Sequence, residues 1–461
     1  MSHIQPQKML LVCVFFLVVF VIKSIITALR PGLRAIPGPF IARISSLYRP
    51  LKISKGDAPD FYRRLHETYG PIVRTGPNTV DISDPKAIST IYGINSKFLK
   101  SRFYDTFHPV YEDEPMPSMF SVRDPVQHQA LRRPVAQKFS MSSIKALEPC
   151  ADECTKIFID AMRDLEGQCI DLSAWLQWYA FDVIGVITFQ RRFGFMEKRK
   201  DVNGMIDALD KGLHYGGIVS QVPALHHWLL GNRWVAKFIA LQPFIHVAHP
   251  LRTILEVNGS DTTAIALRAI IYFLVKNVSA YNKLQHEIDE ADQAGRISEY
   301  ITYAECLELP YLQAVMKEAM RCHPSVSFPL ERVVPEGGAT FSNIHLQSGT
   351  IVGINPAVIH CDKTIFGDDA DAFRPERWTE SSEDHIKLMD RHLMTFGFGS
   401  RTCIGKNISI MEMGKLIPQI IRHFELEWAS EKPEWNVQTF FFAKQHGLKC
   451  RLRARSEHAQ R

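Results

Sequence analysis

The stretch of the chain best suited to chemistry is a glycine-rich loop around one cysteine, Phe396-Gly397-Phe398-Gly399-Ser400-Arg401-Thr402-Cys403-Ile404-Gly405. Glycine has no Cβ, so the backbone can turn sharply and lie close to a flat ligand. A helix-forming stretch follows, so Cys403 precedes a helix N-terminus, where backbone N–H groups and the helix dipole favour a thiolate. The loop predicts a metal ligand or a nucleophile. A buried free cysteine beside a glycine turn is the alternative.

A second chemical feature is the polar patch Asn258-Gly259-Ser260-Asp261-Thr262-Thr263 within an apolar, helix-like run over residues 251–276. Gly259 permits a local opening of the helix, and a threonine can bond back to a carbonyl and bend it. Asp261 and Thr262 form an acid–alcohol pair that can relay protons. Taken alone the patch indicates a helix kink; with the Cys403 loop downstream it favours the relay.

Two further polar groups stand at helical spacing. Glu318 and Arg321 share a helix face, and Arg377, in Phe373-Arg374-Pro375-Glu376-Arg377-Trp378, offers a third charge. When buried, such a group forms a rigid bracket, so we expect structural support rather than chemistry from it. His128 and Arg132 share another helix face, for which an exposed polar surface is the alternative.

The elements that must position these residues are mainly helical. Hydrophobic periodicity and turn signals predict helices over residues 60–69, 175–189, 202–213, 281–294 and 311–322, and short strands over 71–83, 330–334, 340–341, 350–354, 424–428 and 448–452. An aromatic, proline-containing stretch over residues 100–123 reads as a loop. We therefore expect a mainly α fold with a small β region.

Composition narrows the function classes. The chain has 461 residues and a net charge of +5, without a dense Lys/Arg run, so nucleic acid is not an expected partner. A modest basic excess suits an acidic protein or an anionic membrane surface, although a generic solvated surface explains it as well. The nine cysteines include no Cys-x-x-Cys pair, which argues against structural zinc and disulfides and for a reducing compartment.

The N-terminus predicts a membrane anchor. Residues 9–29 are apolar except for Lys23-Ser24, which is long enough to span a bilayer if Lys23 reaches an interface. A cleaved signal peptide is the alternative, but no small-residue cleavage site is evident. Lys23, Arg30 and Arg34 favour a single-pass protein whose remaining chain faces the cytosol. We expect an anchor over 1–30, a Pro/Gly hinge and linker over 31–50, and a catalytic domain over 51–461.

Taken in chain order, the His128/Arg132 pair, the polar patch at 258–263, the Glu318/Arg321/Arg377 group and the Cys403 loop resemble the motifs of the cytochrome P450 family. The resemblance covers residues 30–452. The local sequences over residues 330–338 and 401–407 are similar to those of fungal members near the pisatin demethylase group, which act in secondary metabolism. The resemblance implies a P450 fold with an N-terminal transmembrane helix, on the endoplasmic reticulum membrane. It also implies a haem b cofactor, electrons from NADPH through a flavin-containing NADPH–cytochrome reductase, and oxidation of a small hydrophobic substrate.

The same resemblance implies roles for individual residues. Cys403 would be the axial thiolate ligand of the haem iron, a ligation that favours O–O cleavage in this family. Asp261 and Thr262 would supply protons for oxygen activation. The remaining residues that the resemblance places at the cofactor are the loop residues Phe396 and Gly405 and the propionate partners Arg132, Arg332, Arg401 and, where the family has tryptophan, His128.

Two departures from the family pattern leave alternatives open. Asn258 replaces the usual alanine, and Pro250 precedes Asn258 by only eight residues, so a segment before the relay is short. The short segment is a real variant or a gene-model error, and an inactive product of a truncated gene is one alternative function. A haem-thiolate isomerase or dehydratase that uses no O2 is the other.

Overall fold

The computed structural model describes residues 15, 18–19, 21–108, 110–111, 114–230 and 259–455. Asn258 and the segment before it lie outside the described residues, as do residues 9–14, 16–17 and 20 of the predicted membrane span. Residues 21–28 are helical, with exposed apolar side chains such as Ile22, Ile25 and Ile26. Among the described residues, the helix that is long and apolar enough to cross a membrane is Leu172–Phe189, whose side chains are mostly buried in protein.

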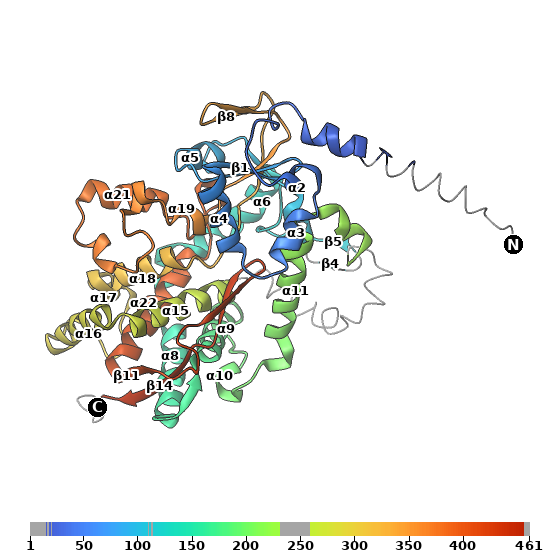
Figure 1. Cartoon of the computed structure of the whole chain (residues 1–461). Coiled ribbons are helices and arrows are strands. Elements are labelled where there is room, and N and C mark those ends of the chain that lie inside the picture. The colour runs from blue at the N-terminus through green and yellow to red at the C-terminus, as the bar shows by residue number, and fades with distance from the viewer. Residues whose placement is uncertain are drawn as a thin grey trace.

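The described elements are mostly helices, with short strands at both ends of the chain (Figure 1). The first part contains α2 (Phe40–Ile44), α3 (Tyr48–Ile53), α4 (Ala58–Tyr69), β1 (Ile72–Gly76), β2 (Thr79–Ile82), α5 (Ala87–Tyr92), β3 (Leu99–Lys100), η1 (Arg102–Phe107), β4 (Val110–Tyr111), β5 (Glu114–Pro115), α6 (Pro125–Ala136), η2 (Gln137–Phe139), α7 (Met141–Lys145) and α8 (Glu148–Asp164). The middle part contains β6 (Cys169–Asp171), α9 (Leu172–Phe189), α10 (Phe195–Lys198), η3 (Val202–Gly204), α11 (Met205–Val219), η4 (Pro223–Trp228), α15 (Gly259–Lys276), α16 (Val278–Gln293), α17 (Tyr303–Leu307) and α18 (Pro310–Cys322). The last part contains β7 (Arg332–Val333), β8 (Ala339–Phe341), β9 (Ile344–Leu346), β10 (Ile351–Gly353), α19 (Pro356–Ile359), α20 (Lys363–Phe366), η5 (Pro375–Trp378), α21 (Glu383–His392), η6 (Gly399–Arg401), α22 (Lys406–His423), β11 (Phe424–Trp428), β12 (Asn436–Thr439), β13 (Ala443–His446) and β14 (Lys449–Ala454).

The largest sheet joins segments that are far apart in the sequence, in the order β1-β2-β10-β7-β3. Strand β10 runs parallel to β2, and the other neighbours are antiparallel. In the pairing of β3 with β7, Lys100 stands opposite Arg332. Since directly opposite residues in an antiparallel pair are neighbours, the sheet register brings two cations together.

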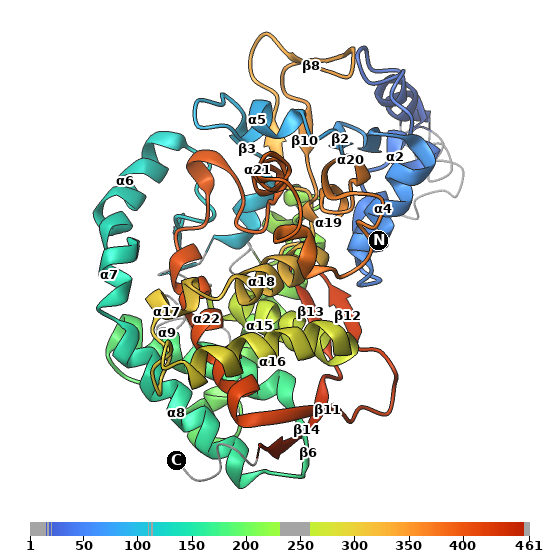
Figure 2. The same cartoon turned by 90° about the vertical axis from the view of Figure 1, so that its left-hand side faces the viewer.

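The main hydrophobic core is built by α8, α9, α15, α16, α18 and α22, whose buried side chains form one cluster. Figure 2 shows α15 and α18 at the centre, with the largest sheet on one side and β11 and β14 on the other. Full burial of a Leu or Ile side chain contributes about 1.5–3 kcal/mol. The helices that carry the polar patch, the Glu-x-x-Arg pair and the C-terminal side of the Cys403 loop are therefore held rigidly together.

The mainly α fold with a small β region is confirmed, as are the helices at α4, α9, α16 and α18. One predicted helix boundary was wrong. We expected the helix that starts near Val202 to end before Gly216-Gly217, but α11 continues to Val219. A Cβ at Gly216 would stand 2.7 Å from the Phe107 ring, and one at Gly217 would stand 2.0 Å from the Phe440 carbonyl oxygen. These glycines permit close packing there, and do not break the helix.

Candidate functional site

The Cys403 loop is a tight turn that closes on itself. The Cys403 N–H donates to the Phe396 carbonyl oxygen at 2.8 Å. Gly397 and Gly399 have positive φ, and a Cβ at Gly399 would stand 2.0 Å from the Tyr92 carbonyl oxygen, so no larger residue fits there. Gly405 is the N-cap of α22, and a Cβ on it would stand 3.9 Å from the Cys403 sulfur. The glycines keep side chains away from the thiol.

The Cys403 thiol is not activated by the helix terminus alone. Although the Cys403 side chain is exposed, desolvation by the protein atoms around it raises the thiol pKa, while the N–H groups of Gly405 and Lys406 and the charge of Arg132 lower it by less. The thiolate that the sequence predicts at Cys403 would thus need a cation at the sulfur. Among the described residues, no group of three or more His, Cys, Asp or Glu side chains could hold a metal ion by itself. A metal at Cys403 would therefore need donors from a non-protein group.

Four cations gather beside the loop and are called here the cationic cluster: Lys100, Arg132, Arg332 and Arg401. Arg132 donates to the Thr402 carbonyl oxygen at 2.8 Å, and Arg401 donates to the carbonyl oxygens of Val122 and Arg123. Lys100 and Arg332 are each 6% exposed. None of the four takes part in an ion pair within the part of the chain that the structure describes.

The electrostatics show that these cations face one another. Burial and the charges of Arg332 and Arg401 hold the pKa of the Lys100 ammonium well below its usual value. Burial, followed by the charge of Arg332, lowers the pKa of Arg401 to about 10. Burial and the charges of Arg401 and Arg132 lower the pKa of His128, on the buried face of α6, to about 4. Such mutual repulsion favours binding of an anion with more than one charge.

The donor set fits a haem with two carboxylate groups. Arginine is suited to carboxylate recognition because its guanidinium presents paired donors, and a glycine cradle beside the thiol leaves room for a flat group. Of the predicted partners, Arg132, Arg332, Arg401 and His128 are brought together by the structure. Lys100 was missed, because only the sheet register places it opposite Arg332.

The acid of the predicted proton relay is held by a neighbouring helix. Gln177 on α9 donates from Nε2 to Asp261 Oδ1 at 2.6 Å, and Arg268 donates to Gln177 Oε1 at 2.7 Å. Burial raises the pKa of the Asp261 carboxyl, although nearby Lys444 acts against this. The acid faces a cavity of about 190 Å³ between α11, α15 and the β12–β13 hairpin.

Thr262 and Thr263 of the patch are hydrogen-bonded to other parts of the fold. Ser325 Oγ donates to the Thr262 carbonyl oxygen at 2.9 Å. Thr263 Oγ1 lies 2.8 Å from Ser409 Oγ on α22, the helix that follows Cys403. Gln177 and Ser409 were missed by sequence reasoning, since nothing in their local sequence signals these contacts. The patch is thus hydrogen-bonded to three separate elements of the fold.

Glu318, Arg321 and Arg377 form a fully buried charge group, called here the bracket. Glu318 accepts from Arg321 Nε and Nη2, both at 2.8 Å, and from Arg377 Nε at 2.9 Å. Trp378 Nε1 donates to the same carboxylate at 2.9 Å. These donors hold the pKa of the Glu318 carboxyl below its usual value despite its burial. All three predicted members are in contact; Trp378 was not foreseen.

His360 connects the bracket to the segment that leads into the Cys403 loop. Its Nδ1 lies 3.1 Å from the Arg321 carbonyl oxygen, and the Met394 N–H donates to its Nε2 at 2.8 Å. Burial lowers the pKa of His360 to about 3. The ring is therefore neutral, with the proton on Nδ1, and sequence reasoning gave no sign of this role.

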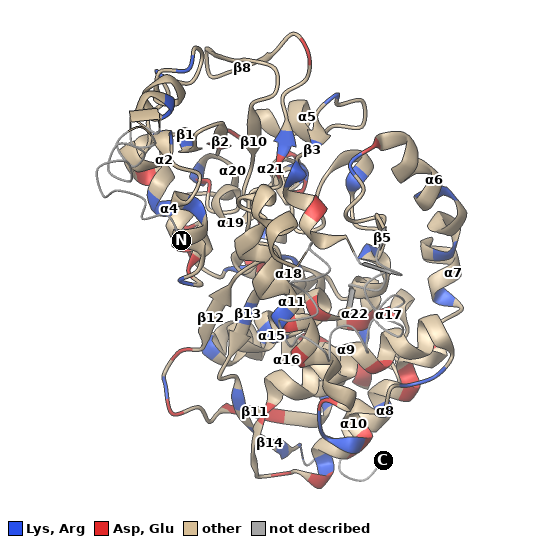
Figure 3. Ribbon diagram, turned by 90° about the vertical axis from the view of Figure 1, so that its right-hand side faces the viewer, with Lys and Arg blue, Asp and Glu red and all other residues tan. Residues whose placement is uncertain are grey.

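Exposed basic side chains surround the outer side of the loop: Arg133, Lys138, Lys145 and Lys406. Figure 3 shows basic residues along α6 and α7, whereas charges of both signs are mixed elsewhere on this side. Asn407 Nδ2 donates to the Phe139 carbonyl oxygen at 3.0 Å, which ties η2 to the start of α22. A basic surface therefore lies over the loop.

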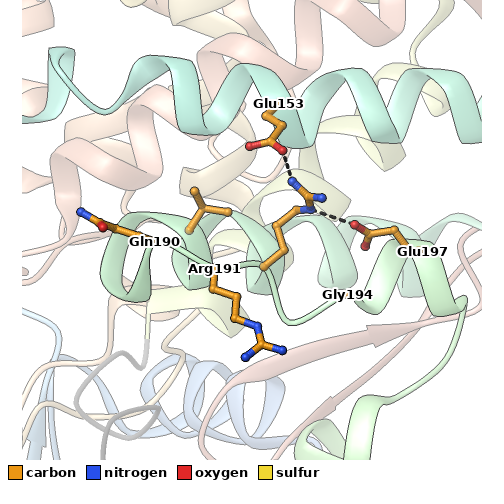
Figure 4. A pocket seen from close by; sticks show the side chains of 7 residues that line it. Glu153, Gln190, Arg191, Gly194 and Glu197 are labelled. Carbon is orange, nitrogen blue, oxygen red and sulfur yellow. Dashed lines mark hydrogen bonds and ion pairs between the residues drawn. The ribbon is translucent and has the colours of Figure 1, made fainter.

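A second cavity, of about 380 Å³, contains none of the predicted site residues. It lies between α8, the end of α9 and the start of α10, where Arg192 pairs with Glu153 and Glu197 (Figure 4). Its charges are matched by each other, and it is open to solvent. We assign it no chemistry.

Comparison with known proteins identifies the class to which this fold and site belong. The cytochrome P450 family model matches residues 37–238 and 252–449. The chain therefore belongs to the cytochrome P450 family. The break between the two matched blocks covers residues 239–251.

The relatives are fungal enzymes. The cytochrome P450 monooxygenase cicH of Emericella nidulans is 35% identical over 96% of this chain and 98% of its own length. A pisatin demethylase of Fusarium vanettenii is 35% identical over 90% of this chain and 87% of its own. The cytochrome P450 monooxygenase gsfF of Penicillium aethiopicum is 33% identical over 92% and 94%. The predicted family, its likeness to fungal members that include pisatin demethylase, and the oxidoreductase class are confirmed.

The cicH alignment runs over 486 positions, more than the 461 residues of this chain, so that relative has residues without a counterpart here.

Proposed function

We propose that the protein is a haem-thiolate monooxygenase that uses O2 and NADPH-derived electrons to oxidise a small hydrophobic molecule in fungal secondary metabolism. One observation carries the proposal. A cysteine in a glycine cradle stands beside four cations that lack a carboxylate partner among the described residues. A dianionic haem ligated by Cys403 would complete both features.

When bound, the haem supplies the oxygen activation; the chain positions it and moves protons. Arg132, Arg332, Arg401 and Lys100, with His128, would hold the propionates, and Phe396 and Gly405 shape the cradle. Asp261, with its raised pKa, would take up a proton from the cavity beside it and pass it toward Thr262. Gln177 fixes the carboxylate so that Oδ1 is occupied as an acceptor.

The electron donor is proposed to be a membrane-bound NADPH–cytochrome reductase. The basic surface over the loop, formed by Arg133, Lys138, Lys145 and Lys406, suits an acidic partner surface. Substitution of Lys138 and Lys145 by Glu should raise the KM for reductase, with the CO-binding spectrum unchanged. An unaltered KM with added reductase contradicts this partner surface.

We place the protein on the endoplasmic reticulum membrane, with an anchor over 1–30, a hinge over 31–50 and the catalytic domain facing the cytosol. Four large apolar side chains that follow the anchor are exposed, Phe40, Ile41, Leu47 and Leu51, as are the apolar side chains of residues 21–29. Such a contiguous apolar surface suits contact with lipid. Removal of residues 1–30 should shift the protein from the carbonate-resistant membrane fraction toward the supernatant.

A hydrophobic substrate is supported by the elements near the relay. Aromatic side chains of the 100–123 segment, Phe103, Phe107 and Phe120, contact Phe441 of the β12–β13 connection. Phe328, within the predicted substrate-facing stretch, contacts Phe441 as well. Phe103, Phe107 and Phe120 thus form an apolar wall against Phe441, which suits a hydrophobic substrate.

The deciding experiment is the CO difference spectrum of the reduced protein. The proposal requires a thiolate-type, red-shifted band that Cys403→Ser abolishes. Its absence in the unsubstituted protein rejects the monooxygenase and supports an inactive gene product. The Thr262→Ala variant distinguishes the monooxygenase from an oxygen-independent isomerase or dehydratase. A monooxygenase should then divert electrons to peroxide, whereas an isomerase keeps its rate.

A further inference from the structure

Glu331 is a buried acid directly beside the cationic cluster. It precedes Arg332 in the sequence and is 3% exposed. Its Oε1 accepts from Arg49 Nη2 at 2.6 Å, and its Oε2 accepts from Ser101 Oγ at 2.5 Å. Ser101 in turn follows Lys100. Glu331 and its partner Ser101 are thus the sequence neighbours of the two buried cations, Arg332 and Lys100, and both carboxylate oxygens are occupied by other donors.

The cations of the cluster do not use this carboxylate. Arg332 Nη1 donates to the Glu331 backbone oxygen at 2.9 Å and to Tyr104 Oη at 3.4 Å. Lys100 donates to the Phe120 carbonyl oxygen and lies over the Tyr104 ring at 4.0 Å. The charges of Arg332 and Glu331 both act on the Tyr104 hydroxyl, so the two lie in one electrostatic environment.

Arg49 comes from a distant part of the chain, α3, and is 4% exposed. Without Arg49, the buried Glu331 carboxylate would lose its charged partner, and Arg332 and Lys100, which have no ion pair among the described residues, would be the alternative partners, because a buried charge is costly unless it is paired. Pairing with Arg332 or Lys100 would cancel part of the positive charge that a dianion needs.

We propose that Arg49 is a positioning residue that withholds the Glu331 carboxylate from the cationic cluster, so that Lys100 and Arg332 remain available to the haem propionates. Ser101 completes the arrangement by occupying the second oxygen. Ser101 Oγ also accepts from the Phe103 N–H at 3.1 Å, so the same carboxylate fixes the start of the aromatic 100–123 segment. The proposal rests on the proposed haem-binding function.

The test measures haem retention, and not turnover. Purified holoenzyme is mixed with excess apomyoglobin, and the Soret band reports the rate at which haem leaves. Arg49→Met should speed haem loss by about tenfold, because the freed carboxylate competes for Arg332 and Lys100. Glu331→Met should not speed it, and the double variant Arg49→Met/Glu331→Met should return to the parental rate. Arg422→Met, which breaks the buried pair with Asp292 far along α22, is the matched control for loss of a buried ion pair.

A purely structural role gives a different pattern. Equal acceleration by both single variants, a double variant as fast as Arg49→Met, or a rate for Arg49→Met no higher than that for Arg422→Met would overturn the proposal. If Arg49→Met does not fold, Ser101→Ala carries the test. It frees one oxygen and should speed haem loss about two- to threefold, and adding Glu331→Met should cancel that effect; no such cancellation overturns the proposal. A missing thiolate band in the parental protein rejects the proposed function instead, whatever these rates are.

Discussion

The bracket and the cationic cluster are two buried charge groups that follow opposite rules. In the bracket, Glu318 is bound by Arg321, Arg377 and Trp378, and the remaining guanidinium groups reach backbone carbonyls. Among the described residues, the partners of the four cluster cations are backbone oxygens, a tyrosine hydroxyl and aromatic rings. The first group is satisfied by the protein itself, whereas the cations of the second lower one another's pKa values. We therefore expect buried charge to support the fold in the bracket and to prepare anion binding in the cluster.

The largest expected effect is on the bracket side. Glu318→Gln removes the anion and leaves two guanidinium groups buried without it. Loss of one partner of a buried ion pair typically costs about 3–5 kcal/mol. Chemical denaturation should show this loss and poor haem incorporation. Asp390→Asn, which breaks the half-exposed pair with Lys317, is the control and should change stability by no more than about 1 kcal/mol. Equal stability of the two variants would show that the bracket is not structural.

Acid should weaken the connection from the bracket to the Cys403 loop. The folded-state pKa of His360 is lowered to about 3, so between pH 6.5 and 3 the unfolded chain binds a proton that the folded chain does not. Stability is therefore lost as pH falls through this window, by about 1.4 kcal/mol per pH unit from this residue. His360→Gln should flatten the measured slope, and His286→Gln, at an exposed position, should not. A slope unchanged by His360→Gln contradicts the assignment.

Removing a charge from the cationic cluster should change protein stability in the opposite direction from removing a charge from the bracket. Lys100→Met removes a buried cation whose pKa is lowered by burial and by neighbouring charges. The haem-free protein should gain stability, because a buried charge is costly unless it is paired. The holoprotein should release haem faster. Lys145→Met, on the exposed face of α7, should do neither. Destabilisation of the haem-free protein by Lys100→Met would mean that the cluster, like the bracket, is a structural device.

The smallest expected effect is on turnover, through the hydrogen bond that holds Asp261 of the predicted proton relay. Gln177→Leu removes the donor to Asp261, and since that hydrogen bond lowers the Asp261 pKa, the pKa should rise further. We expect turnover to fall by about two- to tenfold, with the acid limb of the pH–rate profile moved to higher pH. Haem retention should stay parental, which separates this residue from the cluster. A pH profile that does not move argues that Asp261 is not the relevant acid.

The sequence alone predicted a chemistry for the Cys403 loop, which stays a prediction, and the membership of the bracket, whose three residues are in contact. Motifs of this kind are local: the glycines, Cys403 and the Glu-x-x-Arg spacing are set by backbone conformation within a few residues. Periodicity likewise predicted the helices that carry them, because each buries a continuous apolar face. It failed at Gly216-Gly217, where only the packing of Phe107 and Phe440 shows why glycine stands inside a helix.

The tertiary structure decided which distant residues share a charge environment. Lys100 joins Arg332 through the register of two short strands, and Arg49 reaches Glu331 across 282 positions of sequence. No local pattern encodes such pairings, since electrostatic coupling depends on distance and burial and not on spacing along the chain. For the same reason the pKa direction of Cys403 could not be read from the helix that follows it. Desolvation by protein atoms around the thiol, which the sequence does not show for one side chain, outweighs the helix terminus.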